Sequence, residues 1–243
     1  MAFASVRLRR IIELKERLDE IANEKDEFQF VENPRNEVID ESRRRLETSS
    51  FVDVLEVFGR DMDKNKIIEM LLSESNQQEV VSGVPIVSIV AMPGIGKTTL
   101  AQLIFNDDIV KNHFNKRMWI HVSKSFDKVK VAMHIIREIG GNIVHQGDHD
   151  ITWQDVHHQL TSFVDGKHFL LVLDDIWNEN PEEWDPLRRS LKYGSQGSRI
   201  IVTTRNEKVA VMMGTTYFHR LGVLPDEACW FVETLCLCWK AKR

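Results

Sequence analysis

The chain has 243 residues, of which 42% are hydrophobic and 28% are charged, values typical of globular proteins that bury at least one sizeable core. A formal net charge of −5 argues against a nucleic-acid partner, because proteins that follow phosphate backbones normally carry a basic face. No run of about 18 apolar residues predicts a transmembrane segment, and the charged N-terminus lacks the apolar core of a signal peptide. The three cysteines all lie in the last fifteen residues, which is no disulfide framework. We therefore expect a cytoplasmic protein.

Residues 1–30 are predicted to form an amphipathic helix. Its apolar residues recur at helical spacing, at Ile11, Leu14, Leu18 and Ile21. The heptad pattern lasts only about two and a half repeats, too few for a free-standing coiled coil, so the apolar stripe needs a partner surface. That surface belongs either to the same chain or to another protein. Residues 31–56 are polar, interrupted by proline and without period, and we expect a linker there.

A second domain is predicted over residues 57–222, beginning with a turn and a helix. The chain then alternates β-rich apolar runs with helical patterns. The predicted strands are residues 85–92, 117–122, 168–175, 198–204 and 215–221. Five strands with intervening helices predict an α/β domain built on a doubly wound, mostly parallel sheet. The continuous apolar runs FLLVL and RIIV are typical of central strands covered on both faces.

The stretch AMPGIGKTTL, residues 91–100, follows a predicted strand and opens a predicted helix, as a phosphate-binding loop must. The backbone N–H groups from Gly94 to Thr98 would point at phosphates, and the helix dipole would add roughly half a positive charge. We expect the Lys97 side chain to reach the outer phosphates and the Thr98 hydroxyl to bind Mg²⁺. Glycine at position 96, as at 94, allows the backbone to approach the ligand closely.

Two further motifs end at predicted strand termini. HFLLVLDDIW places Asp174 and Asp175 where ligands of open parallel sheets bind. We expect Asp174 to hold Mg²⁺ through its water shell and Asp175 to orient or deprotonate an attacking water, although simple surface acids would also fit the pattern. GSRIIVTTR delivers Arg205 to the same edge, where a guanidinium could contact a terminal phosphate; an ordinary surface arginine is the alternative.

Five ordered motifs together resemble the NB-ARC nucleotide-binding domain of plant intracellular immune receptors of the coiled-coil, leucine-rich-repeat type. The motifs are VFGRDMDK, IVSIVAMPGIGKTTLAQLIFND, HFNKRMWIHVSKSFD, FLLVLDDIWN and GSRIIVTTR. The resemblance extends from about Arg43 to Trp230, and LKERLDEIANEKDEF is similar to the closing helix of that family's N-terminal domain. It implies a P-loop NTPase sheet and a molecular switch in defence against pathogens. ADP would be held at rest and exchanged for ATP on activation.

The resemblance also implies a role for each site residue. Val57, Phe58 and Arg60 would line the adenine side; Gly94, Ile95, Gly96, Lys97, Thr98 and Thr99 would bind the phosphates; Thr98 and Asp174 would hold magnesium; and Arg205 would contact the γ-phosphate. Residues 223–243 would begin a helical subdomain that the sequence does not complete. Because the missing subdomains close the nucleotide pocket in the family, we expect weaker ADP binding than in a complete receptor.

Two other functions are compatible with the sequence. The chain could act as an interaction partner of full-length immune receptors through its N-terminal helix, with nucleotide structural or absent. It could also be a turnover enzyme, but it lacks the Asn-Lys-x-Asp guanine motif and carries Asp175 where vigorous ATPases often place a glutamate. We therefore expect at most slow ATP hydrolysis. The histidine-rich polar stretch around Trp153 contains no predicted helix that would gather metal ligands.

Overall fold

The computed structural model describes residues 48–73, 83–122, 126–142 and 152–224. All of them belong to one compact unit, Leu46–Arg243. The predicted N-terminal helix, residues 31–47 of the expected linker and residues 225–243 lie outside the described part of the chain. The described residues belong mainly to the predicted nucleotide-binding domain and to the short segment that precedes it.

The domain is built on a five-stranded sheet in which every neighbouring pair is parallel. The strands lie in the order β2-β3-β4-β1-β5. Their bounds are β1 Ile86–Val90, β2 Lys116–His121, β3 Phe169–Ile176, β4 Arg199–Thr204 and β5 Tyr217–Arg220. Every residue of β1 and β4 is buried, and so is every residue of β3 except Asp175. This burial explains the continuous apolar runs in the sequence and confirms the predicted α/β fold with a parallel sheet.

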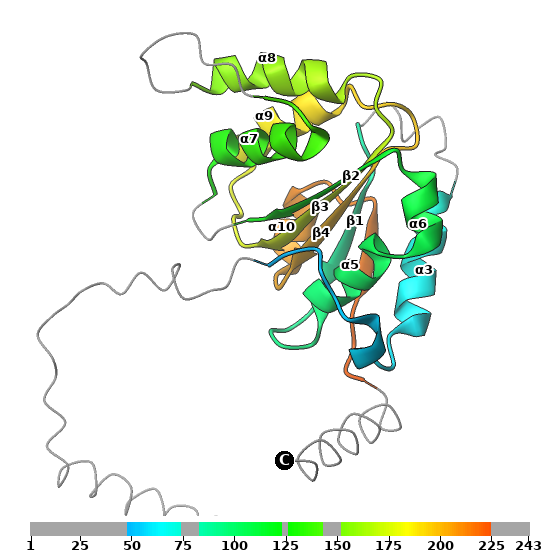
Figure 1. The fold of residues 1–243 in the computed structure, drawn as a ribbon. Helices are drawn as coiled ribbons and strands as arrows, with labels where there is room; N and C mark the ends of the chain where they lie inside the picture. Colours follow the sequence, from blue (N-terminus) through cyan, green and yellow to red (C-terminus); the bar gives the residue numbers. More distant parts are fainter. Residues whose placement is uncertain (1–47, 74–82, 123–125, 143–151, 225–243) are drawn as a thin grey trace, which may run out of the picture. The chain divides into compact units, whose positions relative to one another are not determined.

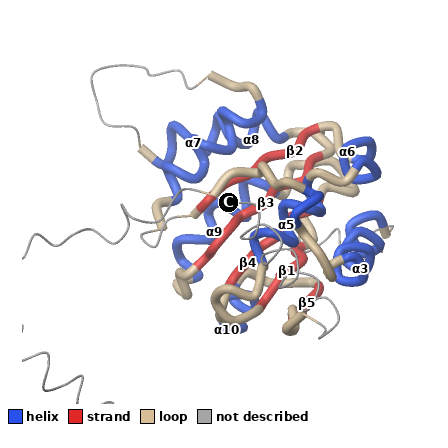
Figure 2. Tube along the Cα trace, turned by 60° about the horizontal axis from the view of Figure 1, so that its bottom comes forward, coloured by secondary structure: helices blue, strands red, loops and turns tan. Residues whose placement is uncertain are grey.

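Helices cover both faces of the sheet (Figures 1 and 2). One layer consists of α3 Asp61–Leu72, α5 Lys97–Phe105 and α6 Asp108–His113. The other consists of α7 Lys128–Ile139, α8 Trp153–Val164, α9 Pro181–Leu191 and α10 Glu207–Met212. A short 3₁₀ helix, η1 Val54–Glu56, precedes α3. No helix among the described residues is long and apolar enough to cross a membrane.

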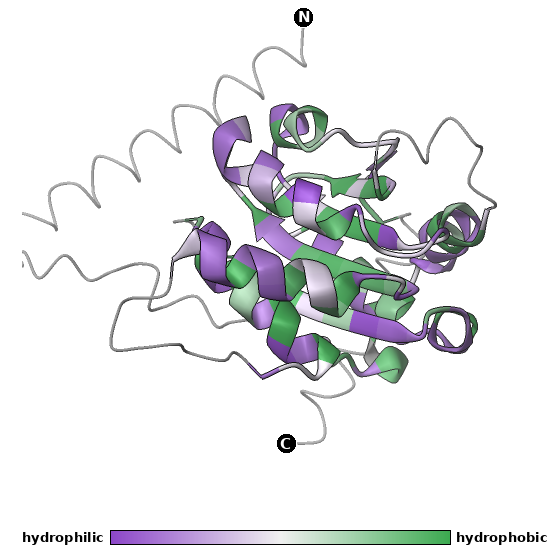
Figure 3. Ribbon diagram, turned by 90° about the horizontal axis from the view of Figure 1, so that it is seen from above, coloured by the Kyte–Doolittle hydropathy of each residue, from purple (hydrophilic) through white to green (hydrophobic). Residues whose placement is uncertain are grey.

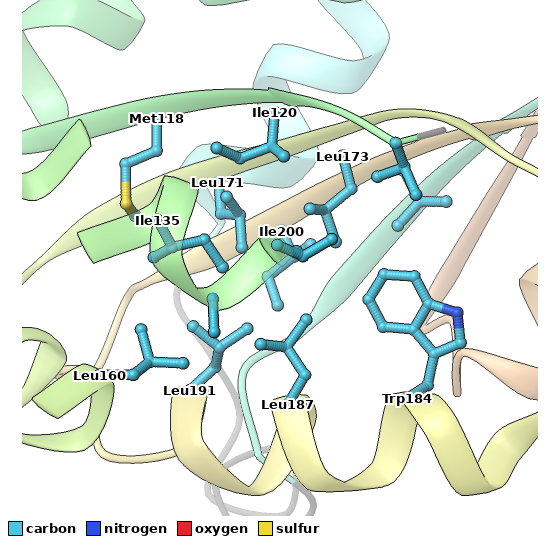
Figure 4. Packing of buried hydrophobic residues seen from close by; sticks show 14 of the residues in the cluster. Met118, Ile120, Ile135, Leu160, Leu171, Leu173, Trp184, Leu187, Leu191 and Ile200 are labelled. Atoms are coloured by element: carbon cyan, nitrogen blue, oxygen red, sulfur yellow. The ribbon is translucent and has the colours of Figure 1, made fainter. Parts of the chain in front are cut away.

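The sheet separates two hydrophobic cores. Along β3, Leu171 and Leu173 pack into the core beneath α7, α8, α9 and α10, while Leu170 and Val172 pack into the core beneath α3, α5 and α6. This alternation is the period of two that a strand imposes on its side chains. Figure 4 shows the first core, where Leu160, Leu187, Leu191 and Trp184 from the helices meet the strand residues. In Figure 3 the hydrophobic colour follows the sheet, and the helices alternate between hydrophobic and hydrophilic residues.

Helix α8 was not among the elements predicted from the sequence. It runs through the stretch around Trp153, where no helix had been predicted to gather metal ligands. Thr152 and Asp155 form a reciprocal capping box at its N-terminus, and this pair is a readable start signal. Val156, Leu160 and Val164 then recur every four residues and are fully buried. The abundant polar residues hid this stripe because they occupy the outer face.

Gly194 offers a test of the packing. A Cβ added there would lie 2.4 Å from Cε1 of Phe169, whose side chain is fully buried and cannot swing away. We expect Gly194→Ala to lower the free energy of unfolding by about 1–3 kcal/mol, as overpacking does. Gly222 is the matched control, because an added Cβ meets nothing within 4 Å there. Measured by urea unfolding, the free energy of unfolding of Gly222→Ala should lie within about 0.5 kcal/mol of that of the unchanged chain. Equal losses in the two variants would contradict the close packing of Gly194 against Phe169.

Candidate functional site

The glycine-rich loop connects β1 to the N-terminus of α5, as the sequence predicts. Gly94 and Gly96 have φ angles of 79° and 99°, a left-handed region that residues with a side chain rarely adopt. Gly96 is the N-cap residue of α5, and the helix begins at Lys97. Since glycine has no capping side chain, the first N–H groups of α5 remain available to an anionic ligand. The loop therefore has the conformation that a phosphate site requires.

The Lys97 side chain folds back over the loop and is 7% exposed. Its Nζ donates hydrogen bonds to the carbonyl oxygens of Ala91 at 2.9 Å and Met92 at 3.0 Å. Burial lowers the pKa of Lys97, and the nearby Arg205 lowers it further, while Asp175 and Asp174 oppose the shift. The ammonium group is thus held at the loop, and a negatively charged ligand beside it would raise the pKa of Lys97 again.

Asp174, near the end of β3, has a side chain with no exposed surface. It accepts hydrogen bonds from the hydroxyl groups of Thr98 at 3.0 Å, Thr203 at 2.5 Å and Thr48 at 2.7 Å. Burial by itself would raise the pKa of Asp174, but the nearby His121, with Nδ1 3.9 Å from Oδ2, and the three threonine hydroxyls lower it by more, and the net pKa is lowered. Asp174 is therefore kept ionised although it is buried.

The residues expected to hold magnesium fit that ion. The Thr98 hydroxyl and the Asp174 carboxylate come from motifs far apart in the sequence and lie within hydrogen-bond distance of each other. Both offer hard oxygen atoms, and Mg²⁺ in nucleotide sites binds few protein oxygens while keeping several waters and phosphate ligands. Thr98 would bind the ion directly, and Asp174 would hold it through its waters.

Asp175 and Arg205 lie together at the same edge of the sheet. Asp175 has a φ angle of 60°, the only positive value among the described residues other than glycine. Its carboxylate is 3.6 Å from Nε of Arg205, within ion-pair range but longer than a hydrogen bond. The Arg205 guanidinium also stacks on Trp177, with 4.2 Å from its Cζ to the ring centre. The acid expected to act on water is thus paired with the arginine expected to contact the γ-phosphate.

The residues expected on the adenine side lie before α3. Arg60 is buried, and its Nη2 donates a 2.8 Å hydrogen bond to the carbonyl oxygen of Ile95 in the loop. Its Nη1 pairs with Asp63 at 3.1 Å. Val57 and Phe58 are half-buried in the segment that leads to Arg60. Arg60 therefore has a contact that the sequence did not suggest, because it fixes the backbone of the phosphate loop.

Four residues that no motif assigned to the site contact Asp174 or Arg205. Thr203 ends a predicted strand at the correct edge but received no role, and its hydroxyl both donates to Asp174 and accepts from the backbone N–H of Asp175. Trp177 was assigned no role at the site from the sequence, yet the Arg205 guanidinium stacks on it. Thr48 and His121 belong to a segment and a strand that no motif links to Asp174. Only the structure shows that they meet there.

The loop between β1 and α5, its Lys-Thr pair and the acid on β3 define the class of P-loop nucleotide-binding proteins. Residues 60–238 match the NB-ARC domain, and the chain belongs to this family. The chain is 40% identical to RPP13-like protein 1 of Arabidopsis thaliana over 195 residues, which are 79% of this chain and 18% of that protein. It is 36% identical to disease resistance protein RGA2 of Solanum bulbocastanum over 224 residues, which are 92% of this chain and 22% of that protein.

The chain therefore spans about a fifth of the length of these curated relatives. Among solved structures, the ORC1 protein of Aeropyrum pernix, determined in complex with DNA, has a similar fold with a TM-score of 0.53. The sequence identity is 16%, and the match covers 74% of this chain and 50% of that one. This likeness concerns the fold alone. The family match confirms the resemblance inferred from the five motifs and identifies the chain as an NB-ARC nucleotide-binding module of the kind found in plant disease resistance proteins.

The lowered pKa of Asp174 predicts how acid affects the domain. A carboxyl group whose pKa is lower in the folded state stabilises the fold at pH values above its ordinary pKa of 3.8. This contribution is lost as the pH falls through the folded-state pKa. At pH 6 we expect Asp174→Asn to lower the free energy of unfolding by about 1–3 kcal/mol, because buried hydroxyl donors lose their charged acceptor. The deficit should shrink as the pH falls below about 4.

Urea unfolding of both chains at pH 6 and pH 3 measures this change. Asp185→Asn is the control, because Asp185 is exposed on α9. A deficit in Asp174→Asn that stays constant down to pH 3 would show that Asp174 is not ionised in the folded chain.

Proposed function

We propose that this chain binds ADP or ATP together with Mg²⁺ and serves as a two-state switch module in plant defence. The observation that carries the proposal is the contact between Thr98 and Asp174, 3.0 Å apart, because it joins the phosphate loop to the acid of a different strand. The names of the relatives, which include a disease resistance protein, support the link to defence. The proposal places the chain in the cytoplasm, with protein partners contacting the predicted helix of residues 1–30, outside the described residues.

Phosphate binding follows from the geometry of the loop. The N–H groups after Gly94 and the N-terminus of α5 supply donors and a partial positive charge to the phosphates. Lys97 would exchange the carbonyl oxygens of Ala91 and Met92 for phosphate oxygens, which carry more negative charge. Arg60 would hold the loop in place meanwhile through the carbonyl of Ile95. Bound magnesium supplies positive charge to the phosphates.

Discrimination between ADP and ATP would lie with Arg205. Its guanidinium lies close to Asp175, with 3.6 Å between Nε and the carboxylate, and a phosphate that accepts two hydrogen bonds is a better partner. Trp177 would keep the guanidinium plane oriented during the exchange. A ligand shifts a conformational equilibrium only through contacts that differ between the states, and the third phosphate provides such a contact here. With Asp175 engaged by an arginine, we expect turnover below about 1 s⁻¹.

Removal of the Lys97 charge tests nucleotide binding. Lys97→Ala should weaken ADP binding about 100-fold, because a charged hydrogen-bonding partner of the phosphates is worth about 3 kcal/mol. Calorimetry measures the affinity, and chromatography of nucleotide released on denaturation shows what the purified chain carries. Lys111→Ala is the control, since Lys111 lies on the surface of α6 and pairs with Asp108. A native chain that purifies empty and binds no added nucleotide would refute the proposal.

Substitution of Arg205 tests discrimination. Arg205→Ala should weaken ATP binding about tenfold and leave ADP binding within about twofold, because only ATP offers the terminal phosphate. The ratio of the two dissociation constants, measured on the same preparation, removes any general loss of affinity. Arg189→Ala, an exposed change on α9, should leave that ratio unchanged. An equal loss for both nucleotides would place Arg205 elsewhere in the site.

A further inference from the structure

The segment Thr48–Ser50, which we call the strap, runs along α5 beside the site (Figure 1). Its backbone is fastened to that helix by two side chains. Nε2 of Gln102 donates a 2.6 Å hydrogen bond to the carbonyl oxygen of Ser49, and Nδ2 of Asn106 donates one of 2.6 Å to that of Ser50. The strap falls within the stretch expected to be a plain linker, yet it forms part of the site.

The first residue of the strap contacts the carboxylate expected to hold magnesium. The Thr48 hydroxyl donates its proton to Oδ2 of Asp174 at 2.7 Å. Nδ1 of His121 lies 3.1 Å from the same hydroxyl oxygen. Because a hydroxyl has one proton and Thr48 gives it to Asp174, Nδ1 of His121 must be the donor in the second bond. A chain of hydrogen bonds thus runs from His121 through Thr48 to Asp174.

These contacts leave no surface on Asp174 for water. Its side chain is 0% exposed, and three hydroxyl groups cover its two oxygens. A water bound to magnesium must contact one of those oxygens, so one hydroxyl has to move. Thr98 is itself the expected metal ligand, and Thr203 is fixed in the fully buried strand β4. Thr48 is half-buried on a surface segment and is the hydroxyl that can leave.

We propose that the Thr48 hydroxyl and magnesium-bound water compete for Asp174. Without the metal, Thr48 takes the place of that water and the strap is closed; when the magnesium nucleotide binds, Thr48 is displaced and the strap opens. This inference rests on the proposed nucleotide function and adds a regulatory contact to the same site. Coupling between two sites is reciprocal, so a partner that pulls the strap away from α5 would strengthen magnesium binding by the same factor.

The magnesium dependence of ADP binding tests the competition on the full chain. Thr48→Val keeps the side-chain shape and removes the hydroxyl, so it should lower the half-saturating Mg²⁺ concentration about three- to tenfold, the equivalent of one hydrogen bond. Affinity for ADP in EDTA should stay unchanged. Ser49→Ala is the matched control, because it removes a hydroxyl from the same strap without touching Asp174 and should leave the Mg²⁺ dependence as it is.

A second variant opens the strap without altering the carboxylate. Gln102→Ala removes the anchor of Ser49 and should shift the Mg²⁺ dependence in the same direction as Thr48→Val, by a smaller factor. Hydrogen exchange gives a readout independent of affinity. Amides in a peptide covering residues 48–55 should exchange faster with ADP and Mg²⁺ than with ADP and EDTA.

The outcomes separate this inference from the proposed function. A higher or unchanged half-saturating Mg²⁺ concentration in Thr48→Val overturns the competition while ADP binding stands. Equal exchange of the strap with and without the metal overturns it as well. If the native chain binds no nucleotide at all, the proposed function fails, and the competition fails with it.

Discussion

A charged carboxylate without solvent contact is the constraint on which the rest of the site depends. An isolated ion in the interior would cost many kcal/mol, so Asp174 requires donors from every direction. Hydroxyl donors come from three places: the start of α5, strand β4 and the segment before η1. His121 of β2 adds a contact through Thr48. These elements must all be in position before the charge is stabilised. Folding and the arrangement of this edge of the sheet are therefore coupled, since the network around Asp174 also brings four parts of the chain together.

The glycine-rich loop obeys a complementary constraint. It must keep its N–H groups free for a ligand, and its carbonyl oxygens accept hydrogen bonds from side chains instead. Lys97 bonds two of its carbonyl oxygens, and Arg60 bonds a third, at Ile95. Two cations thus stabilise the loop, and one of them is also suited to contact phosphate. The loop is preorganised, and binding requires an exchange of partners more than a change of shape.

Much of the fold could be predicted because its signals are local. Continuous apolar runs indicated the buried strands, and the loop motif placed the start of α5 at Lys97. Helix α8 was missed because its stripe of Val156, Leu160 and Val164 is thin among polar residues. Two motifs were enough to predict that Thr98 and Asp174 lie at the same edge of the sheet, where the structure brings them within 3.0 Å of each other. Thr48 could not be found in this way, since it meets Asp174 through a contact 126 positions apart in the sequence, and nothing nearby distinguishes it from other polar linker residues.

The separation of the two cores has a consequence for variation among relatives. The residues that we place at the nucleotide site lie on the strands, on α5, on the loops that follow the strands or in the segment before α3. None of those described comes from α7, α8 or α9, which pack on the opposite face of the sheet. The outer surface of that helical layer is free to diverge in sequence as long as its buried stripe is kept. The surface of α7, α8 and α9 can thus vary while α5, the strands and the loops after them keep the residues that we place at the site.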